Sequence, residues 1–290
     1  MKVVAVTGAG SMLGEQLCAI LIESGVTVIR VGRDTDAEIN LDLRHGLKKA
    51  VKSVADVLFH CAAGFGDDSP EGVRANFEIN AAGCLHVLEL ADRLNCRSVV
   101  GAGTLSSCEK FEPGSMTSYG LSKAQGESLL QWGMMRRGGK FCALRFPQLF
   151  DTNGRSVKHQ AWFGRVVTYA GAGLDLNLPA SEGPRNFLHV EDAARLMLTA
   201  GQRGMSGVYS VVHQELINMG ELAELAFGIF GRGGTARISD VKKPFRRVNY
   251  PKDAGMFQAL DISPAISLRE GLARIRDAGT ESAFGPLDVT

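Results

Sequence analysis

The segment that decides the fold is residues 3–14, which read VVAVTGAGSMLG. A short β-branched run comes first, then a turn with glycines at Gly8, Gly10 and Gly14, and then apolar residues at helical spacing. Glycine lets the backbone approach a pyrophosphate closely, and the start of the following helix supplies N–H donors and a favourable dipole. We therefore expect a dinucleotide-binding turn over residues 8–14, although Ser11 stands where a further glycine might be expected. The predicted cofactor contacts in it are Gly8, Gly10, Ser11, Met12, Leu13 and Gly14.

Short apolar runs alternate with helical patterns beyond this unit, which is typical of a parallel sheet with crossover helices. We expect strands at residues 3–6, 26–31, 54–60, 98–102, 142–146 and 207–212, and a long helix at residues 80–94. The predicted fold is α/β, a doubly wound parallel sheet (Rossmann) with a smaller C-terminal α/β substrate lobe. The expected Rossmann domain comprises residues 1–150 and about 186–213. The expected substrate lobe comprises residues 151–185 and 214–290.

Bulk composition excludes several classes of partner. The chain has 290 residues and a net charge of +1, and its basic residues form no stripe, so we expect no nucleic-acid partner. Its six cysteines show no C-x-x-C spacing and no clustering with histidine, which predicts reduced thiols and no metal. No signal peptide leads the sequence and no apolar run is long enough to span a bilayer, so we expect a cytoplasmic protein with no membrane partner.

Tyr119 and Lys123 are the strongest candidates for catalysis. They lie four residues apart, so a helix would present them on one face. An ammonium beside a phenol stabilises the ionised form, and we expect Lys123 to lower the pKa of Tyr119 from about 10. Such a phenol can protonate a carbonyl oxygen, or deprotonate a hydroxyl, while a hydride moves.

The end of the second expected strand, Gly32-Arg33-Asp34, predicts which dinucleotide is used. Gly32 leaves space where an acidic residue would favour NAD, and Arg33 can pair with a 2′-phosphate. We therefore expect NADP. Asp34 keeps NAD open, since a shift of one residue would put its carboxylate on the ribose, and Arg33 could also be a solvated loop charge.

Several motifs occur in an order that resembles the extended short-chain dehydrogenase/reductases, the NAD-dependent epimerase/dehydratase family. They lie at residues 7–14, 41–44, 56–63, 80–83, 119–123 with Glu127, 144–148 and 185–193. Because the matches run over nearly the whole chain, together they are far more specific than any one alone. The resemblance implies further cofactor contacts at Asp42, Leu43, Cys61, Ala62, Ala63, Asn80 and Pro147, besides Tyr119 and Lys123.

The same resemblance implies roles around the substrate. Thr104 would hydrogen-bond the substrate oxygen, with Ser106 and Ser107 as rivals. Gln148 and Arg185 would contact the substrate, Arg185 at a diphosphate, although Arg185 could also form a salt bridge between the lobes. His189 is interpreted as a packed or turn-capping histidine, and Cys108 as a thiol that is more often passive than catalytic.

These residues favour an NAD(P)-dependent oxidoreductase acting on a nucleotide-linked sugar, most simply a keto-sugar reductase that uses NADPH. Family dehydratases carry Asp-Glu after the threonine, and Leu105 and Ser106 stand there instead, which argues against dehydration. A C4 epimerase that retains NAD is the first alternative, and a non-catalytic NADP-sensing regulatory protein is the second. The resemblance also implies a homodimer formed through helices at residues 80–94 and 123–136, with Leu129, Leu130, Met134 and Met135 as candidate contacts.

Overall fold

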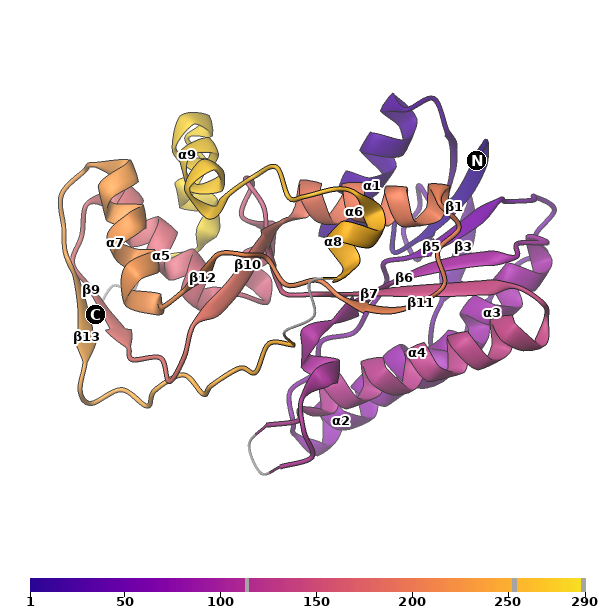
Figure 1. Ribbon diagram of the computed structural model, residues 1–290, viewed down its shortest axis with the longest axis horizontal. Helices are drawn as coiled ribbons and strands as arrows, with labels where there is room; N and C mark the ends of the chain where they lie inside the picture. The colour runs from indigo at the N-terminus through magenta and orange to yellow at the C-terminus, as the bar shows by residue number, and fades with distance from the viewer. Residues whose placement is uncertain (113–114, 252–254, 288–290) are drawn as a thin grey trace. The chain divides into compact units, whose positions relative to one another are not determined.

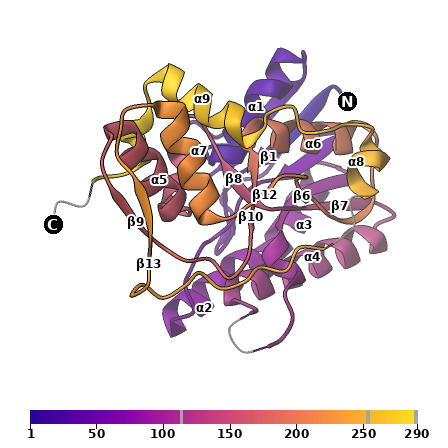
Figure 2. The same ribbon diagram turned by 60° about the vertical axis from the view of Figure 1, so that its left-hand side comes forward.

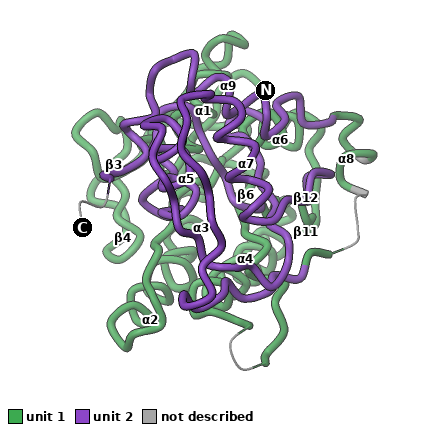
Figure 3. Tube along the Cα trace, turned by 90° about the vertical axis from the view of Figure 1, so that its left-hand side faces the viewer, with its two compact units in different colours: residues 1–146, 193–211, 250–262 green, residues 147–192, 212–249, 263–290 purple. Residues whose placement is uncertain are grey.

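The computed structural model describes residues 1–112, 115–251 and 255–287. They fall into two compact units, shown in Figure 3: unit 1 comprises residues 1–146, 193–211 and 250–262, and unit 2 comprises residues 147–192, 212–249 and 263–290. This division differs from the expected one at residues 147–150, 186–192 and 212–213, which belong to unit 2, and at residues 250–262, which belong to unit 1. Residues 185–189 pair with strands of unit 2, which is why they belong there.

Unit 1 is built on an eight-stranded sheet of order β11-β7-β6-β5-β1-β2-β3-β4. All neighbouring pairs are parallel except β3 with β4, so the predicted α/β fold with a doubly wound parallel sheet is confirmed. All six expected strands lie in this sheet, whereas β3 and β4 were not predicted. The strands are β1 (Val3–Thr7), β2 (Thr27–Gly32), β3 (Ile39–Asp42), β4 (Gly46–Leu47), β5 (Val57–His60), β6 (Ser98–Thr104), β7 (Lys140–Phe146) and β11 (Gly207–Ser210).

Helices cover both faces of this sheet (Figure 1), with α3 and α4 on one face and α1 and α6 on the other. Val87 and Leu90 of α3 and Met134 of α4 are fully buried in the core against the sheet. The expected helix at residues 80–94 starts as a π-helical segment, η1 (Phe77–Ala82), which continues from α2 into α3. The helices are α1 (Met12–Glu23), α2 (Pro70–Asn76), α3 (Gly83–Arg93), α4 (Ser118–Arg136), α6 (Val190–Gln202) and α8 (Gly255–Leu260), with a 3₁₀ turn η2 (Leu105–Cys108).

Unit 2 has its own apolar core around Phe150, Phe163, Phe187 and Phe284. Figure 2 shows α5 and α7 side by side, next to the pair of strands β9 and β13. A second small sheet has the order β12-β10-β8. The elements are β8 (Gln148–Phe150), η3 (Arg155–Lys158), α5 (Ala161–Ala172), β9 (Leu176–Pro179), β10 (Arg185–His189), β12 (Leu216–Ile217), α7 (Met219–Phe230), β13 (Ala236–Ser239), α9 (Leu268–Ala278) and η4 (Glu281–Phe284).

The described residues contain neither a helix that could span a membrane nor a cluster of metal-ligating side chains. Every helix in them is too short or too polar to cross a membrane. No group of three or more His, Cys, Asp or Glu side chains among them is arranged to hold a metal ion.

Candidate cofactor and catalytic site

The glycine turn lies between β1 and α1, as the sequence predicts. Gly8 has a φ of +66°, and a Cβ there would lie 2.7 Å from Cα of Ala62. A Cβ on Gly14 would overlap the carbonyl oxygen of Gly8. The turn can therefore close only with glycine at both positions, and it brings the predicted contacts Gly8 and Ala62 together at the ends of β1 and β5.

Ser11 has a local role that explains the departure from glycine. It is the N-cap of α1, and its Oγ accepts a hydrogen bond from the N–H of Gly14 at 3.0 Å. The N–H groups of Met12 and Leu13 lie in the first turn, where a helix has no acceptor of its own. A tight glycine turn leading into a helix N-terminus fits the pyrophosphate of a dinucleotide.

Two charged residues follow Gly32 at the end of β2. Arg33 is exposed and follows Gly32 directly. The carboxylate of Asp34 lies over Gly10, with Oδ2 2.6 Å from where a Cβ on Gly10 would be. The Asp34 carboxylate therefore lies against the glycine turn.

The predicted cofactor contacts Asp42, Leu43, Cys61 and Ala63 differ in burial and in their hydrogen-bond partners. Asp42 ends β3, and its carboxylate accepts from the N–H of Arg44 at 2.8 Å. Leu43 is buried in the core, and Cys61 is buried with its Sγ 3.9 Å from Sδ of Met197. Ala63 is half-buried, directly after Ala62. Leu43 and Cys61 are therefore explained by packing without a cofactor.

Tyr119 and Lys123 lie in the first two turns of α4. Thr117 caps this helix by accepting from the N–H of Gly120 at 3.1 Å. Nζ of Lys123 donates to the carbonyl oxygen of Ala102 on β6 at 2.8 Å, which ties the helix to the sheet. The Thr104 side chain, at the end of β6, lies close enough to Tyr119 to affect its pKa. Two of the three predicted catalytic residues, Tyr119 and Thr104, thus lie close together, and the third, Lys123, ties α4 to β6.

Burial is the largest influence on the pKa values of Tyr119 and Lys123. Loss of hydration raises the pKa of Tyr119 above its ordinary value, the negative charge of Glu127 adds to the rise, and the Thr104 side chain opposes it. Burial also lowers the pKa of Lys123. The pKa of Tyr119 is therefore raised, contrary to the expectation that Lys123 lowers it, because desolvation and the charge of Glu127 act in the opposite direction.

The three candidate hydroxyls after β6 have different partners. Oγ1 of Thr104 accepts from the N–H of Ser106 at 3.2 Å and caps η2. The buried hydroxyl of Ser107 donates to the carbonyl oxygen of Gly120 at 3.1 Å. The Ser106 side chain is half-buried. Of these three hydroxyls, that of Thr104 acts on the pKa of Tyr119 and lowers it.

Asn80 lies in η1 and connects two segments of the site. Its Oδ1 accepts from the N–H of Gly64, and its Nδ2 donates to the carbonyl of Gly64 and to Oγ of Ser122. Asn76, one turn earlier, makes the matching bonds to Gly66 and Ser118. Sequence reasoning missed Asn76, although the repeat of asparagine after four residues could have revealed it.

A partly buried ion pair joins α4 to β7. Arg145 of β7 donates through Nε and Nη2 to Oε2 of Glu127, at 2.9 and 2.7 Å. Its Nη1 donates to Sγ of Cys108 at 3.4 Å, and that sulfur lies 3.6 Å from Oγ of Ser210. Arg145 therefore joins α4, η2 and β7, and Cys108 is part of this structural link.

The predicted substrate residues Gln148 and Arg185 lie in unit 2, as does Pro147. Nε2 of Gln148 donates to Oε1 of Gln160 at 3.1 Å. The guanidinium of Arg185 lies 5.7 Å from the ring centre of Phe245, and its Nη2 donates to the carbonyl of Arg246 at 2.8 Å.

Further cations and aromatic rings surround Arg185 in this unit. The Phe245 ring packs edge-on to Trp162, and both Lys242 and Arg165 lie over the Trp162 ring. Alternating cations and aromatic faces suit an anionic ligand that carries a flat ring.

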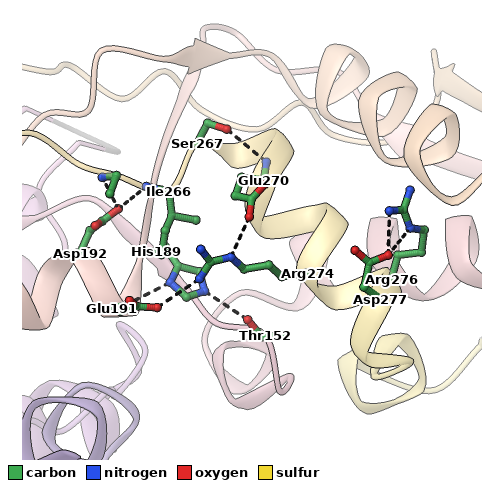
Figure 4. Close-up of polar contacts among 11 residues, drawn as sticks. Thr152, His189, Glu191, Asp192, Ile266, Ser267, Glu270, Arg274, Arg276 and Asp277 are labelled. Atoms are coloured by element: carbon green, nitrogen blue, oxygen red, sulfur yellow. Dashed lines mark hydrogen bonds and ion pairs between the residues drawn. The ribbon is translucent and has the colours of Figure 1, made fainter. Parts of the chain in front are cut away.

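His189 is a structural residue, as the sequence predicted for a packed or capping histidine. Figure 4 shows its ring between Thr152 and Glu191. The N–H of Glu191 donates to Nδ1 at 3.3 Å, so the ring proton lies on Nε2 and can be donated to Oγ1 of Thr152 at 3.3 Å. Burial lowers the pKa of His189, which keeps the ring neutral. Asp192 nearby accepts from the N–H groups of Ala265 and Ile266 and anchors the approach to α9.

Comparison with known proteins defines the class. The model of the NAD dependent epimerase/dehydratase family matches residues 4–219, more than half of the chain. The chain therefore belongs to this family of enzymes, and the resemblance drawn from its motifs is confirmed.

Particular relatives are more distant. The chain is 27% identical over 230 residues to the UDP-2-acetamido-2,6-beta-L-arabino-hexul-4-ose reductase of Pseudomonas aeruginosa, a match that covers 77% of this chain but 56% of that protein. The fold of this chain is similar to that of MoeE5 in complex with UDP-glucose and NAD, with a TM-score of 0.78 and 21% identity. The match covers 96% of this chain and 99% of that one. The fold is also similar to that of the UDP-N-acetylglucosamine 4-epimerase of Bacillus cereus, with a TM-score of 0.76, 21% identity and 96% of each chain covered.

Proposed function

We propose that this chain is an NADP-dependent reductase that acts on the keto group of a nucleotide-linked sugar. The observation that carries the proposal is the placement of Tyr119 and Lys123 one turn apart on α4, next to Thr104 at the end of β6, with burial raising the pKa of the Tyr119 phenol. A phenol that keeps its proton at neutral pH is suited to protonate an oxygen that gains charge, which is what reduction of a ketone requires. The reductase named among the relatives supports the same direction.

Each residue then has a definite task. A bound nicotinamide cofactor supplies the hydride. Thr104 donates a hydrogen bond to the substrate carbonyl oxygen, and Tyr119 transfers its proton to that oxygen as it becomes an alkoxide. Lys123 holds α4 to β6 through Ala102, and it would bind the nicotinamide ribose of a bound cofactor.

The cofactor preference is proposed from the end of β2. Gly32 offers no carboxylate to the ribose, and the exposed Arg33 can make a charge-assisted bond to a 2′-phosphate. We expect Arg33→Ala to weaken NADPH binding roughly 10- to 100-fold, the value of one such bond, and to leave NADH binding unchanged. Asp34→Asn is the matched variant and should leave NADPH binding within about twofold.

The nucleotide half of the substrate is proposed to lie on unit 2. Buried Arg185 with Phe245, Trp162 and Lys242 provides cations for a diphosphate and ring faces for a base. Arg185→Met should weaken binding of a nucleoside-diphosphate sugar, measured by calorimetry, while the exposed Arg237→Ala in the same unit should not. Equal weakening by both variants would argue against a specific diphosphate contact.

A C4 epimerase remains the second candidate, because the carboxylate of Asp34 lies over Gly10, where it could accept from ribose hydroxyls and favour NAD. The test is the nucleotide released on denaturation, followed by titration of the emptied protein with NADPH and NADH. Little retained nucleotide, NADPH preference and NADPH consumption with a nucleotide-linked 4-keto sugar would support the reductase. Tightly retained NAD would support the epimerase.

The sensor hypothesis has its own test. Tyr119→Phe should bind the cofactor normally and lose turnover by roughly 10²- to 10⁴-fold, the usual contribution of a general acid. Unchanged biological activity in that variant would instead favour the non-catalytic regulatory protein.

A further inference from the structure

Phe65, in the loop after β5, lies directly on the candidate catalytic tyrosine. The Phe65 and Tyr119 rings stack with centres 4.7 Å apart and planes 23° from parallel. Phe65 itself is 52% exposed, so about half of its surface stays in contact with water. Its ring lies against one face of the Tyr119 ring.

Two side-chain amides hold the backbone on either side of Phe65. Oδ1 of Asn76 accepts from the N–H of Gly66 at 2.7 Å while its Nδ2 donates back to the Gly66 carbonyl at 3.0 Å. Asn80 makes the same pair of bonds to Gly64, at 2.8 and 2.9 Å. Because Asn76 and Asn80 lie one helical turn apart, the glycines that flank Phe65 are fixed to one rigid element.

The same asparagines also fix the catalytic helix. The second Nδ2 hydrogen of Asn76 is donated to Oγ of Ser118 at 2.9 Å, and that of Asn80 to Oγ of Ser122 at 3.1 Å. Ser118 immediately precedes Tyr119, and Ser122 immediately precedes Lys123. Both asparagines are buried, at 0% and 4% exposed, and each uses both donor hydrogens and its acceptor oxygen.

Close packing on both sides of Phe65 requires glycine at positions 64 and 66. A Cβ on Gly66 would overlap the carbonyl oxygen of Gly72, and one on Gly64 would lie 2.9 Å from Cδ1 of Ile79. A loop that needs only to connect β5 to α2 would not require two paired amides and two close backbone approaches around one exposed ring.

We propose that Phe65 is a positioning residue that holds Tyr119 in its reactive orientation, and that the Asn76–Asn80 pair keeps Phe65 against it. The stacked ring restricts rotation of the phenol and keeps water from one of its faces. The proposal deepens the function proposed above, since the oriented group is the proton donor of that reaction.

The test compares Phe65→Leu, Phe65→Trp and Phe111→Leu. Leucine keeps an apolar side chain but removes the stack, tryptophan restores a ring, and Phe111 is a control ring that is 79% exposed in the same unit. Tyrosine isotope-labelled at Cζ gives a resonance for each of the four tyrosines, and Tyr119→Phe identifies that of Tyr119. This measurement requires no substrate, and NADPH affinity and melting temperature report whether each variant is folded.

We expect Phe65→Leu to move the Tyr119 resonance through loss of the ring current and to lower kcat roughly 10- to 100-fold, as small misplacements of reacting groups do. Phe65→Trp should recover most of the rate, and Phe111→Leu should change neither quantity. A Tyr119 resonance that is unchanged in Phe65→Leu would overturn the proposal, whatever the rate does. Absence of turnover in the unmodified protein would count against the reductase, and the resonance would still decide the role of Phe65.

Discussion

At the scale of single residues, the central question is which environmental effect sets the proton affinity of Tyr119. The sequence places Lys123 one turn away and suggests a lowered pKa. In the structure, Nζ of Lys123 is occupied by the carbonyl of Ala102, and Glu127 contributes a negative charge on the same side of α4. Desolvation is then the largest effect and raises the pKa of Tyr119, which favours an acid over a base.

This leads to a prediction on pH. Below its pKa the phenol carries its proton, so a raised pKa keeps the donor competent throughout the neutral range and up to about pH 10, the ordinary value for tyrosine. We expect kcat for ketone reduction to stay constant from about pH 6 to about pH 9. Buried His60 does not titrate in that window, since burial lowers its pKa to about 3.

The measurement is the NADPH-dependent rate at saturating substrate across that pH range. A rate that falls as pH rises through neutrality, and loses this fall in Tyr119→Phe, would mean that the pKa of Tyr119 is lowered instead. The reverse reaction requires the ionised phenol, so its rate should rise with pH over the same range.

At the scale of elements, close approach between α4 and η1 sets the position of the catalytic helix. A Cβ on Gly126 would overlap the carbonyl oxygen of Asn80 and lie 2.8 Å from Sγ of Cys84. We expect Gly126→Ala to lower the free energy of unfolding by about 1–3 kcal/mol, because the helix must move away from its neighbour. Chemical denaturation monitored by circular dichroism measures it.

Gly228, within α7, is the matched control for that substitution. Nothing lies within 4 Å of a Cβ placed there. Gly228→Ala should therefore stabilise the protein by about 0.5–1 kcal/mol, the usual gain in helix propensity. A stabilising Gly126→Ala would show that α4 and η1 are not in close contact.

The elements also show what sequence reasoning can and cannot reach. Local patterns were sufficient for β1, the Gly8–Gly14 turn and the shared face of Tyr119 and Lys123, because neighbours in sequence determine them. β3 and β4 were missed because they have only four and two residues, too few for a strand pattern to stand out, although β3 alternates apolar and polar residues. The stack of Phe65 on Tyr119 was missed because it joins residues far apart in the chain.

At the scale of the whole molecule, a homodimer through the outward faces of α3 and α4 remains a prediction. Of the expected contact residues, Leu130 and Met134 are buried in the core, whereas Met135 is 68% exposed. The sequence periodicity could not distinguish apolar residues that pack in the core from those that are exposed and could form an interface. Leu85 on α3 and Trp132 on α4, both about half exposed, were not expected and join Met135 as candidates.

Met135→Asp tests this assembly. In a two-fold interface each substitution acts twice, and each buried Met side chain is worth about 1.5–3 kcal/mol. Together with burial of two carboxylates, the change should raise the dimer dissociation constant at least about 100-fold, which light scattering would register as a halved mass at micromolar concentration. Ile22→Asp on α1, where the native side chain is 59% exposed, is the control and should leave the mass unchanged. A halved mass in the control as well, or an unmodified protein that is already monomeric, would remove α3 and α4 as the interface.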